Sequence, residues 1–349
     1  MNAKKWSGGF SVASLIMAIL FAVNWMIGIG QPVQARSEVL ETTVPAPPAV
    51  TLPTASEPTA PTVPTEPEPE PSGPSQVYLA CEAAAREMDA GHVLVYDAAA
   101  EKMLFCSTDP TDRLYPASIS KLYAAMVALM YLEPEEVITA GEELSKVKKG
   151  SSIAYIKKGH QLKVEMLIEA MLMPSGNDAA FVVAAAAGRK IAGDPKLTAG
   201  AAVDVFNEEM NRQALRLGLM NSHFANPDGY HDDDHYSCPR DVAMVAALAL
   251  QDPIVSKYIG MQQDSVVFES GQHITWYNTN RLLNPDSPYY TPWAVGMKTG
   301  STKEAGNCLL AAFEKDGRQI IVGIFGAESK TERYEDALRL LEICTQPTR

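Results

Sequence analysis

The sequence predicts an α+β fold in which helices cover an antiparallel sheet. Apolar patterns typical of strands occur near both ends of the globular part of the chain, first from residue 92 and again from residue 307. Alanine-rich helical patterns fill the region between them. A chain that pairs strands from its two ends and inserts helices between them keeps the two kinds of element apart, which is the α+β arrangement.

Composition limits the classes of function. The chain has 349 residues, 46% hydrophobic and 20% charged, which is enough for a sizeable core. Its net charge of -13 and the lack of a segregated basic patch exclude binding to nucleic acid. The five cysteines form no CxxC pair and have no histidine at zinc-finger spacing. We expect neither a metal nor a cofactor.

The N-terminal segment, residues 1–35, has the features of an export signal. Lys4 and Lys5 precede an uncharged apolar stretch over residues 6–34. Small residues around Ala35 offer a cleavage site, whereas residues 10–30 are long enough to span a bilayer. Cleaved signal peptide and uncleaved membrane anchor therefore both stay open. Either predicts an exported protein of the extracytoplasmic cell envelope, secreted or membrane-anchored.

A linker rich in Pro, Thr and Glu follows over residues 36–75. Proline at this density permits neither helix nor sheet, so we expect a disordered, extended and semi-rigid spacer. It separates the N-terminal segment from a globular domain over residues 76–349, in which no internal repeat is found.

The domain opens with an amphipathic helical pattern at 79–88. Strand patterns at 92–97 and 102–105 then flank a small-residue turn, as in a hairpin. Helical patterns follow at 121–131, 164–173, 179–187, 203–217 and 239–250. Strand patterns return at 307–314 and 319–325, and an amphipathic helix at 332–344 closes the domain.

Two SxxK elements occur, at 118–121 and 145–148, so the element alone carries little information. Ser118 begins an apolar helix, which places Lys121 on the same face and directs the positive end of the helix at the hydroxyl. Ser145 lies in a lysine-rich, solvated run. Because a serine needs a base and a buried lysine can serve as one, Ser118 and Lys121 are the candidate nucleophile and base.

Two further elements complete a possible active site. Ser175-Gly176-Asn177 supplies a hydroxyl that can relay a proton and an amide that can hold a substrate amide. Lys298-Thr299-Gly300 leads into a predicted strand and supplies a cation and a hydroxyl, beside a glycine that lets a backbone come close. Each triplet alone is typical of a turn. All three elements in this order predict serine acyl-transfer chemistry.

With these elements the chain resembles the penicillin-recognising serine enzymes, and most closely the low-molecular-weight penicillin-binding proteins that are D-alanyl-D-alanine carboxypeptidases. The resemblance covers nearly all of residues 76–349 and implies a β-lactamase/transpeptidase-like fold. Besides the three elements it rests on Gly150-Ser151-Ser152, residues 172–180, Leu217-Gly218-Leu219, Asn226-Pro227-Asp228-Gly229, His235-Tyr236-Ser237, residues 278–283, residues 296–302 and Ala305-Gly306-Asn307.

The resemblance implies catalytic roles for individual residues. Ser118 attacks the peptide bond between the two D-alanines that end a peptidoglycan stem pentapeptide, and Lys121 accepts its proton. Lys298 helps to keep Lys121 neutral by like-charge repulsion. Ser175 passes a proton to the departing D-alanine, and Asn177 holds the substrate amide and Lys121. Water then hydrolyses the acyl-enzyme, as a step in cell-wall biogenesis.

It also implies how substrate is held. Lys298 and Thr299 bind the terminal carboxylate, and the backbone N–H groups of Ser118 and Ser301 form the oxyanion hole. The expected substrate-binding residues are Lys298, Thr299, Gly300, Ser301 and Thr302. β-Lactam antibiotics are the expected covalent inhibitors.

The chain departs from the family pattern in two ways. Position 120 is Ser where Thr is commoner, which keeps the hydroxyl. The sequence after Cys344 holds no β-rich domain and no amphipathic anchor such as many relatives carry, so we expect the N-terminal segment to take over the tethering role.

Two rival functions stay open. A class A β-lactamase shares the chemistry, but it usually has Asp where Gly176 stands and needs a loop glutamate, whereas Glu208 and Glu209 lie in a predicted helix. The other rival is a non-catalytic β-lactam-binding sensor or scaffold. The full set of catalytic residues argues against this second rival.

Two smaller features also permit two interpretations. The run His231–His235 contains metal-ligand residue types, but its neighbours favour a surface loop. Cys81 and Cys344 lie on the predicted first and last helices of the domain, which are adjacent in the resembled fold. They can form a disulfide or pack as two small apolar residues.

Overall fold

The computed structural model describes residues 74–346, which belong to a unit of the chain that begins at Gly73. The predicted signal or anchor, residues 1–35, lies outside the described residues, as does nearly all of the predicted linker, residues 36–75. Both stay predictions.

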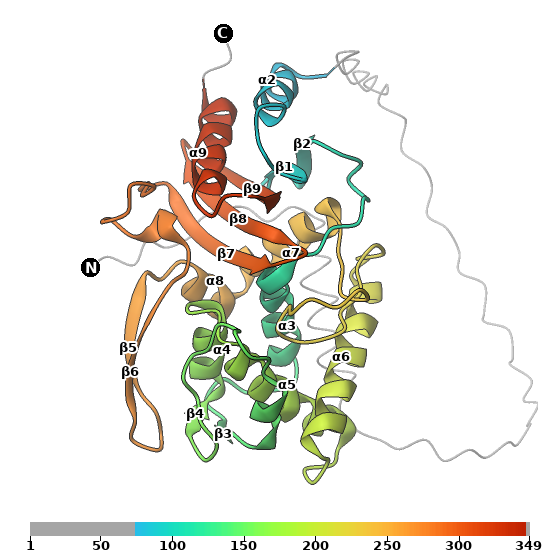
Figure 1. The fold of residues 1–349 in the computed structure, drawn as a ribbon, viewed down its shortest axis with the longest axis vertical. Coiled ribbons are helices and arrows are strands. Elements are labelled where there is room, and N and C mark those ends of the chain that lie inside the picture. Colours follow the sequence, from blue (N-terminus) through green and yellow to red (C-terminus); the bar gives the residue numbers. More distant parts are fainter. Residues whose placement is uncertain (1–73, 347–349) are drawn as a thin grey trace, which may run out of the picture. The chain divides into compact units, whose positions relative to one another are not determined.

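A five-stranded antiparallel sheet forms the centre of the described unit (Figure 1). Its order is β2-β1-β9-β8-β7, so strands from the two ends of the domain pair through β1 and β9. This pairing confirms the predicted α+β fold. The strands are β1 (His92–Asp97), β2 (Lys102–Cys106), β7 (Ala294–Thr302), β8 (Gly306–Lys315) and β9 (Arg318–Ala327).

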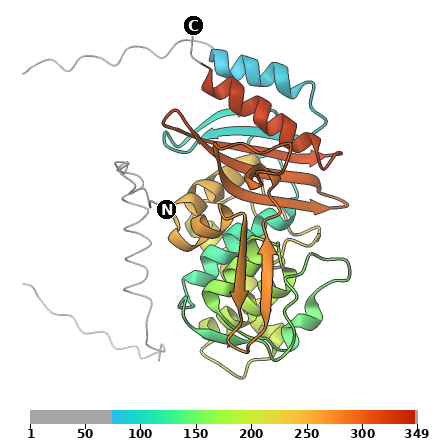
Figure 2. The same ribbon diagram turned by 90° about the vertical axis from the view of Figure 1, so that its left-hand side faces the viewer.

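Both faces of the sheet are buried. Side chains alternate along each strand, so that each strand contributes residues to both faces. On β8, Leu309 and Phe313 point to one face, and Leu310 and Ala312 point to the other. The first face is covered by α2 (Gln76–Ala85) and α9 (Glu332–Thr345), which lie side by side above the sheet in both views (Figures 1 and 2). Tyr334 of α9 is fully buried there.

A lobe of helices lies on the other face of the sheet (Figure 2). Its central helix α3 is buried from Ser120 to Ala128, and α5 is buried nearly as completely. Their many alanines explain this, since small side chains let helices pack closely. The lobe comprises α3 (Ser120–Leu129), α4 (Val164–Leu172), α5 (Asn177–Ala192), α6 (Ala199–Arg216), α7 (Pro239–Gln251) and α8 (Pro253–Ile259).

Some elements were not predicted, mainly because they are short. They are the pair β3 (Val137–Thr139) and β4 (Gln161–Lys163), the hairpin β5 (Gln263–Val267) and β6 (His273–Tyr277), helix α8, and the 3-10 turns η1 (Ala117–Ile119), η2 (Glu142–Lys146) and η3 (Arg281–Leu283). One expectation was wrong. Residues 298–300 do not lead into a strand, because they already lie inside β7, which begins at Ala294.

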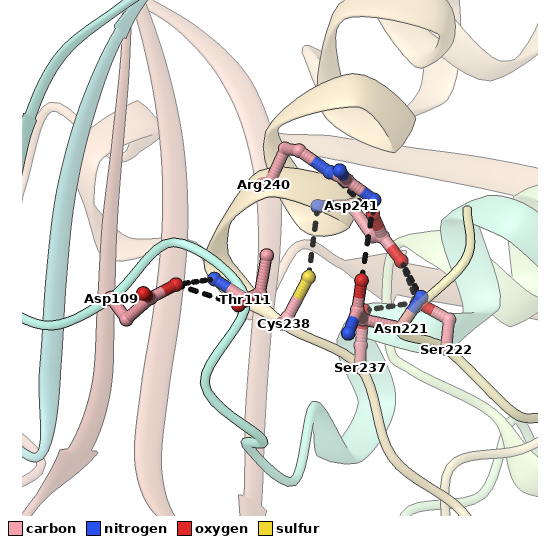
Figure 3. Close-up of polar contacts among 8 residues, drawn as sticks. All are labelled: Asp109, Thr111, Asn221, Ser222, Ser237, Cys238, Arg240 and Asp241. Atoms are coloured by element: carbon pink, nitrogen blue, oxygen red, sulfur yellow. Dashed lines mark hydrogen bonds and ion pairs between the residues drawn. The ribbon is translucent and has the colours of Figure 1, made fainter. Parts of the chain in front are cut away.

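The connection between α6 and α7, residues 217–238, is fixed by Asp241 at the start of α7 (Figure 3). One carboxylate oxygen of Asp241 accepts hydrogen bonds from the backbone N–H of Asn221 and the hydroxyl of Ser222, both at 2.9 Å. The other oxygen lies 3.0 Å from Arg240. This connection carries residues that reach the site described next.

Within residues 74–346, no single helix is long and apolar enough to cross a membrane. Helices α7 and α8 taken together are long and apolar enough, by length and composition only, and the pair is bent by 101° at the break between the two helices.

Candidate active site

Ser118 and Lys121 are in direct contact. The Lys121 ammonium donates to the Ser118 hydroxyl oxygen at 2.8 Å. Ser118 lies in the 3-10 turn η1 immediately before α3, and not on α3 itself as the sequence suggested. Its neighbour Ala117 has a φ of 48°, which is strained for a residue with a Cβ atom. The turn therefore presents Ser118 on a constrained backbone.

Lys121 is fully buried and also donates to Asn177 Oδ1 at 2.8 Å and to the Asp228 carbonyl oxygen at 2.5 Å. Burial lowers its pKa to about 8, against the opposing effect of the Asp228 and Asp178 carboxylates. The sequence analysis attributed a neutral Lys121 partly to Lys298. Burial is instead the main cause, and the repulsion between the two cations is seen as a lowering of the Lys298 pKa.

The second element forms the turn between α4 and α5. Ser175 adopts a φ of 63° and is buried, and Asn177 is the first residue of α5. The Asn177 amide nitrogen donates to Asp228 Oδ2 at 2.5 Å while its oxygen accepts from Lys121. Asn177 is thus joined to the base, and Ser175 precedes it at a strained turn.

The third element lies on β7, the strand that packs against η1. Lys298 is fully buried, and its pKa is lowered well below the usual range by burial, then by Lys121 and Arg333. Gly300 permits the close approach of the two segments, because a Cβ atom there would lie 3.0 Å from the Ser118 backbone nitrogen. The third element therefore lies directly against the turn that carries Ser118.

The hydroxyls of the third element have protein partners. Thr299 donates to the Thr279 hydroxyl at 2.7 Å. Ser301 is exposed and donates to the Gly300 carbonyl at 2.6 Å. The Thr302 hydroxyl accepts from the Ala305 backbone N–H at 2.9 Å, which stabilises the turn between β7 and β8.

His235 completes a buried chain of hydrogen bonds that the sequence analysis missed. Its Nδ1 accepts from the Ala225 N–H at 3.3 Å, so its Nε2 carries the proton and donates to Ser120 Oγ at 2.6 Å. Ser120 in turn donates to the Ala117 carbonyl at 2.9 Å. Burial lowers the pKa of His235 to about 3, which keeps the ring neutral. The chain fixes the backbone just before Ser118.

The expectation that residues 231–235 form a surface loop was wrong for His235, which is buried. His231 packs edge-on against Tyr115 with ring centroids 4.9 Å apart, while the three aspartates between the histidines are exposed. Among residues 74–346 no cluster of three or more His, Cys, Asp or Glu side chains could hold a metal ion.

Asp178, which the sequence analysis also missed, ties residues 154–156 to the first turn of α5, next to the second element. Its carboxylate accepts from the backbone N–H groups of Ala154 at 2.8 Å and Ile156 at 2.9 Å. Between them Tyr155 has a φ of 63° and a 66% exposed side chain. The short motifs around Asp228, His235 and Asp178 were visible in the sequence, but their contacts depend on the fold.

Comparisons with known proteins agree with this geometry. The family model described as D-alanyl-D-alanine carboxypeptidase matches residues 79–329. D-alanyl-D-alanine carboxypeptidase DacF of Bacillus subtilis is 28% identical over 247 residues, which are 69% of this chain and 58% of DacF. The D-alanyl-D-alanine carboxypeptidase of Streptomyces sp. strain K15 is 31% identical over 195 residues, which are 54% of this chain and 63% of the relative. The chain thus spans about three fifths of the length of these relatives.

Solved structures show the same fold. The crystal structure of the Streptomyces K15 DD-transpeptidase is 27% identical, with a TM-score of 0.65, and the match covers 73% of this chain and 97% of that one. A D-alanyl-D-alanine carboxypeptidase from Mycobacterium tuberculosis, 22% identical with a TM-score of 0.63, shares the fold. Both matches agree with the predicted β-lactamase/transpeptidase-like architecture. From the match over residues 79–329, the chain belongs to the D-alanyl-D-alanine carboxypeptidase family.

Proposed function

We propose that this chain is a serine peptidase that removes the C-terminal D-alanine from peptidoglycan stem pentapeptides. The observation that carries the proposal is the 2.8 Å contact between Lys121 Nζ and Ser118 Oγ. With a pKa of about 8, Lys121 is deprotonated in an appreciable fraction of molecules near neutral pH and can accept the serine proton. The activity serves cell-wall biogenesis.

In the proposed reaction Ser118 Oγ attacks the carbonyl carbon of the peptide bond between the two D-alanines as its proton passes to Lys121. The C–N bond then breaks, and the departing amine takes up a proton relayed through Ser175. Water hydrolyses the resulting ester and frees Ser118. The backbone N–H groups of Ser118 and Ser301 stabilise the oxyanion in both halves, and the close approach at Gly300 supports this pairing.

The proposed substrate carries a negative charge at its end, and Lys298 and Thr299 are the groups proposed to bind it. Asn177 would hold the substrate amide as well as Lys121. β-Lactams, which also present an acyl group and a carboxylate, are the proposed covalent inhibitors of Ser118. The remaining residues of the motif, Gly300 to Thr302, would line the acyl site.

We also propose that the protein acts outside the cytoplasm, tethered or released according to whether the N-terminal segment is kept. The support for this is the pair Lys4 and Lys5 before the apolar stretch. The Pro-rich linker would then hold the catalytic domain away from the membrane.

A β-lactamase function has less support. Glu209 is buried and its carboxylate is bound by Tyr131, Gln213 and Arg212, while Glu208 is exposed on α6. Neither contacts Ser118 or Lys121. A transpeptidase function shares every step except the last, in which an amine replaces water, and the similarity to the Streptomyces K15 DD-transpeptidase favours testing it.

The test is D-alanine release from a pentapeptide ending in D-Ala-D-Ala, with and without an amine acceptor. The proposal predicts free D-alanine in stoichiometric excess over enzyme. Transpeptidation would add a product joined to the acceptor. Labelling by fluorescent penicillin without D-alanine release would identify a sensor, and rapid turnover of penicillin would identify a β-lactamase.

A further inference from the structure

Asp228 lies in the connection between α6 and α7 and is 1% exposed. The loop around it is pressed against the nucleophile turn. Gly229 has a φ of 75°, and a Cβ atom there would lie only 2.0 Å from the Ala117 carbonyl oxygen. The Gly229 N–H donates to Asn226 Oδ1 at 2.8 Å, which fixes the loop in this position.

Two different acceptors of Asp228 reach two catalytic side chains. Its backbone carbonyl accepts from Lys121 at 2.5 Å, and its carboxylate Oδ2 accepts from the Asn177 amide at 2.5 Å. The other carboxylate oxygen accepts from the Tyr230 N–H at 3.2 Å. Asp228 therefore joins the base, the amide and its own loop.

The carboxylate decides which way the Asn177 amide faces. A carboxylate only accepts hydrogen bonds, so the Asn177 nitrogen turns toward Asp228 and the oxygen toward Lys121, 2.8 Å away. In the reverse orientation the amide oxygen would face the carboxylate and the amide nitrogen would face the ammonium. Both contacts would then be repulsive.

We propose that Asp228 is a positioning residue of the acylation step, which orients Asn177 and supplies a counter-charge to Lys121. The inference rests on the proposed function, because it takes Lys121 as the base. Asp228 touches neither the reacting atoms nor the proposed substrate, and it acts through the two side chains that do.

The charges around Lys121 give the proposal a measurable consequence. The Asp228 and Asp178 carboxylates raise the pKa of Lys121 against the lowering effect of burial, and burial lowers the pKa of both Lys298 and His235 nearby. Burial raises the pKa of the Asp228 carboxyl, and the opposing effect comes first from Lys121 and last from Lys148. Removing the Asp228 charge therefore lowers the Lys121 pKa, so that the free base is formed at lower pH.

The test is the pH profile of acylation by penicillin, for which the acidic limb reports the base in the free enzyme. In Asp228→Asn, an oxygen can still accept from Asn177, so we expect the limb to move down by about one unit with a modest loss of maximal rate. Asp228→Ala loses the acceptor too, and its maximal rate should fall about tenfold further. The matched control is Glu143→Gln, a buried carboxylate on η2 whose partners are the Gly141 N–H and Arg189, and its limb should not move.

An acidic limb that stays in place in Asp228→Asn, with the wild type reactive, would overturn the inference and leave the proposed function intact. A wild type that neither releases D-alanine nor reacts with penicillin would overturn both. If Asp228→Asn does not fold, the double variant with Lys121→Met decides. The double variant should be more stable than the single variant, because it no longer buries the Lys121 charge without the Asp228 counter-charge. A double variant that is no more stable would contradict the pairing of Asp228 with Lys121.

Discussion

Lys298 is a fully buried lysine whose charged form is disfavoured by its surroundings. Burial and two neighbouring cations, Lys121 and Arg333, lower its pKa, and its ammonium donates to the Thr299 carbonyl oxygen at 3.1 Å. A substrate carboxylate would replace repulsion with attraction. Under the proposed function, Lys298 would therefore discriminate a free acid from a neutral chain end.

Lys298→Ala should lower kcat/KM for a D-Ala-D-Ala peptide by about 100-fold, the loss of a charge-assisted pair in a closed site. A substrate amidated at its C-terminus lacks the carboxylate. It should be poor for the wild type and lose little further in the variant. If the wild type hydrolyses the amidated and free peptides equally well, Lys298 is not the carboxylate anchor.

We expect acylation of Ser118 to require a hydroxyl at position 120. The additional methyl group of a threonine at this position should make little difference. Ser120→Ala breaks the chain from His235 to the Ala117 carbonyl, so the turn before Ser118 is held less firmly. We expect penicillin acylation about tenfold slower or worse, since reactive geometry tolerates little displacement. Ser120→Thr should retain most of the rate. Equal acylation rates in the Ala variant and the wild type would show that the chain has no role in positioning.

Glu169 on α4 is a buried carboxyl whose pKa is raised to about 8 by burial and then by Asp264, with Glu165 adding and Lys257 opposing. The unfolded carboxyl has a pKa near 4.5. Between these values the unfolded chain releases a proton that the folded chain retains. The stability contributed by this group is thus full below pH 4.5 and is lost as pH rises toward 8.

Glu169→Gln removes that titration and keeps the shape of the side chain. The melting temperature of the variant relative to the wild type should therefore increase from pH 5 to about pH 8 and then level off. Thermal denaturation across this range checks it. Parallel curves for the two proteins would mean that Glu169 titrates normally.

At the scale of elements, the first and last helices of the domain, α2 and α9, together cover one face of the sheet. Cys81 of α2 and Cys344 of α9 are both fully buried there, and the neighbouring Cys344 side chain, together with burial, raises the pKa of Cys81. Both are free thiols in the structure. The geometry brings together the two cysteines whose pairing the sequence analysis left open, and a disulfide stays one of the two alternatives.

We expect oxidation by a small disulfide such as oxidised glutathione to join Cys81 and Cys344. Two protein thiols would be oxidised as one glutathione disulfide is reduced to two thiols. The bond would close a loop of about 260 residues and stabilise the fold by about 5 kcal/mol in the entropic model. Thiol counting on the unfolded, unreduced protein should give three, and five would exclude any disulfide. Cys344→Ser is the control, since it cannot form the bridge.

At the scale of the whole molecule, sequence patterns predicted the long elements of residues 74–346 and missed most of the short ones. The helices and the strands of both ends carry apolar repeats long enough to be recognised, so α3, α5, β1 and β9 were found. The β5–β6 hairpin was missed because β5 begins with three polar residues, Gln263 to Ser265, whereas the equally short β2 is apolar from Met103 onward.

The candidate site shows the same division. Ser118, Lys121, Asn177 and Lys298 were predicted because their three compact motifs occur together and in a characteristic order. Asp228 reaches Lys121 over 107 residues of chain, and His235 reaches Ser120 over 115. Contacts of that sequence separation are set by the packing of α3 against the α6–α7 connection, which no local pattern encodes.

The most direct test of the account is to determine which residue penicillin acylates. After treatment, the intact mass should rise by one adduct, and peptide mapping should place it on Ser118. Ser118→Ala should abolish the adduct while the melting temperature shows that the fold is kept, and Ser145→Ala, in the second SxxK element, should be labelled as the wild type is. An adduct that persists in Ser118→Ala, or that maps to Ser145, would contradict the assignment of the nucleophile and the mechanism built on it.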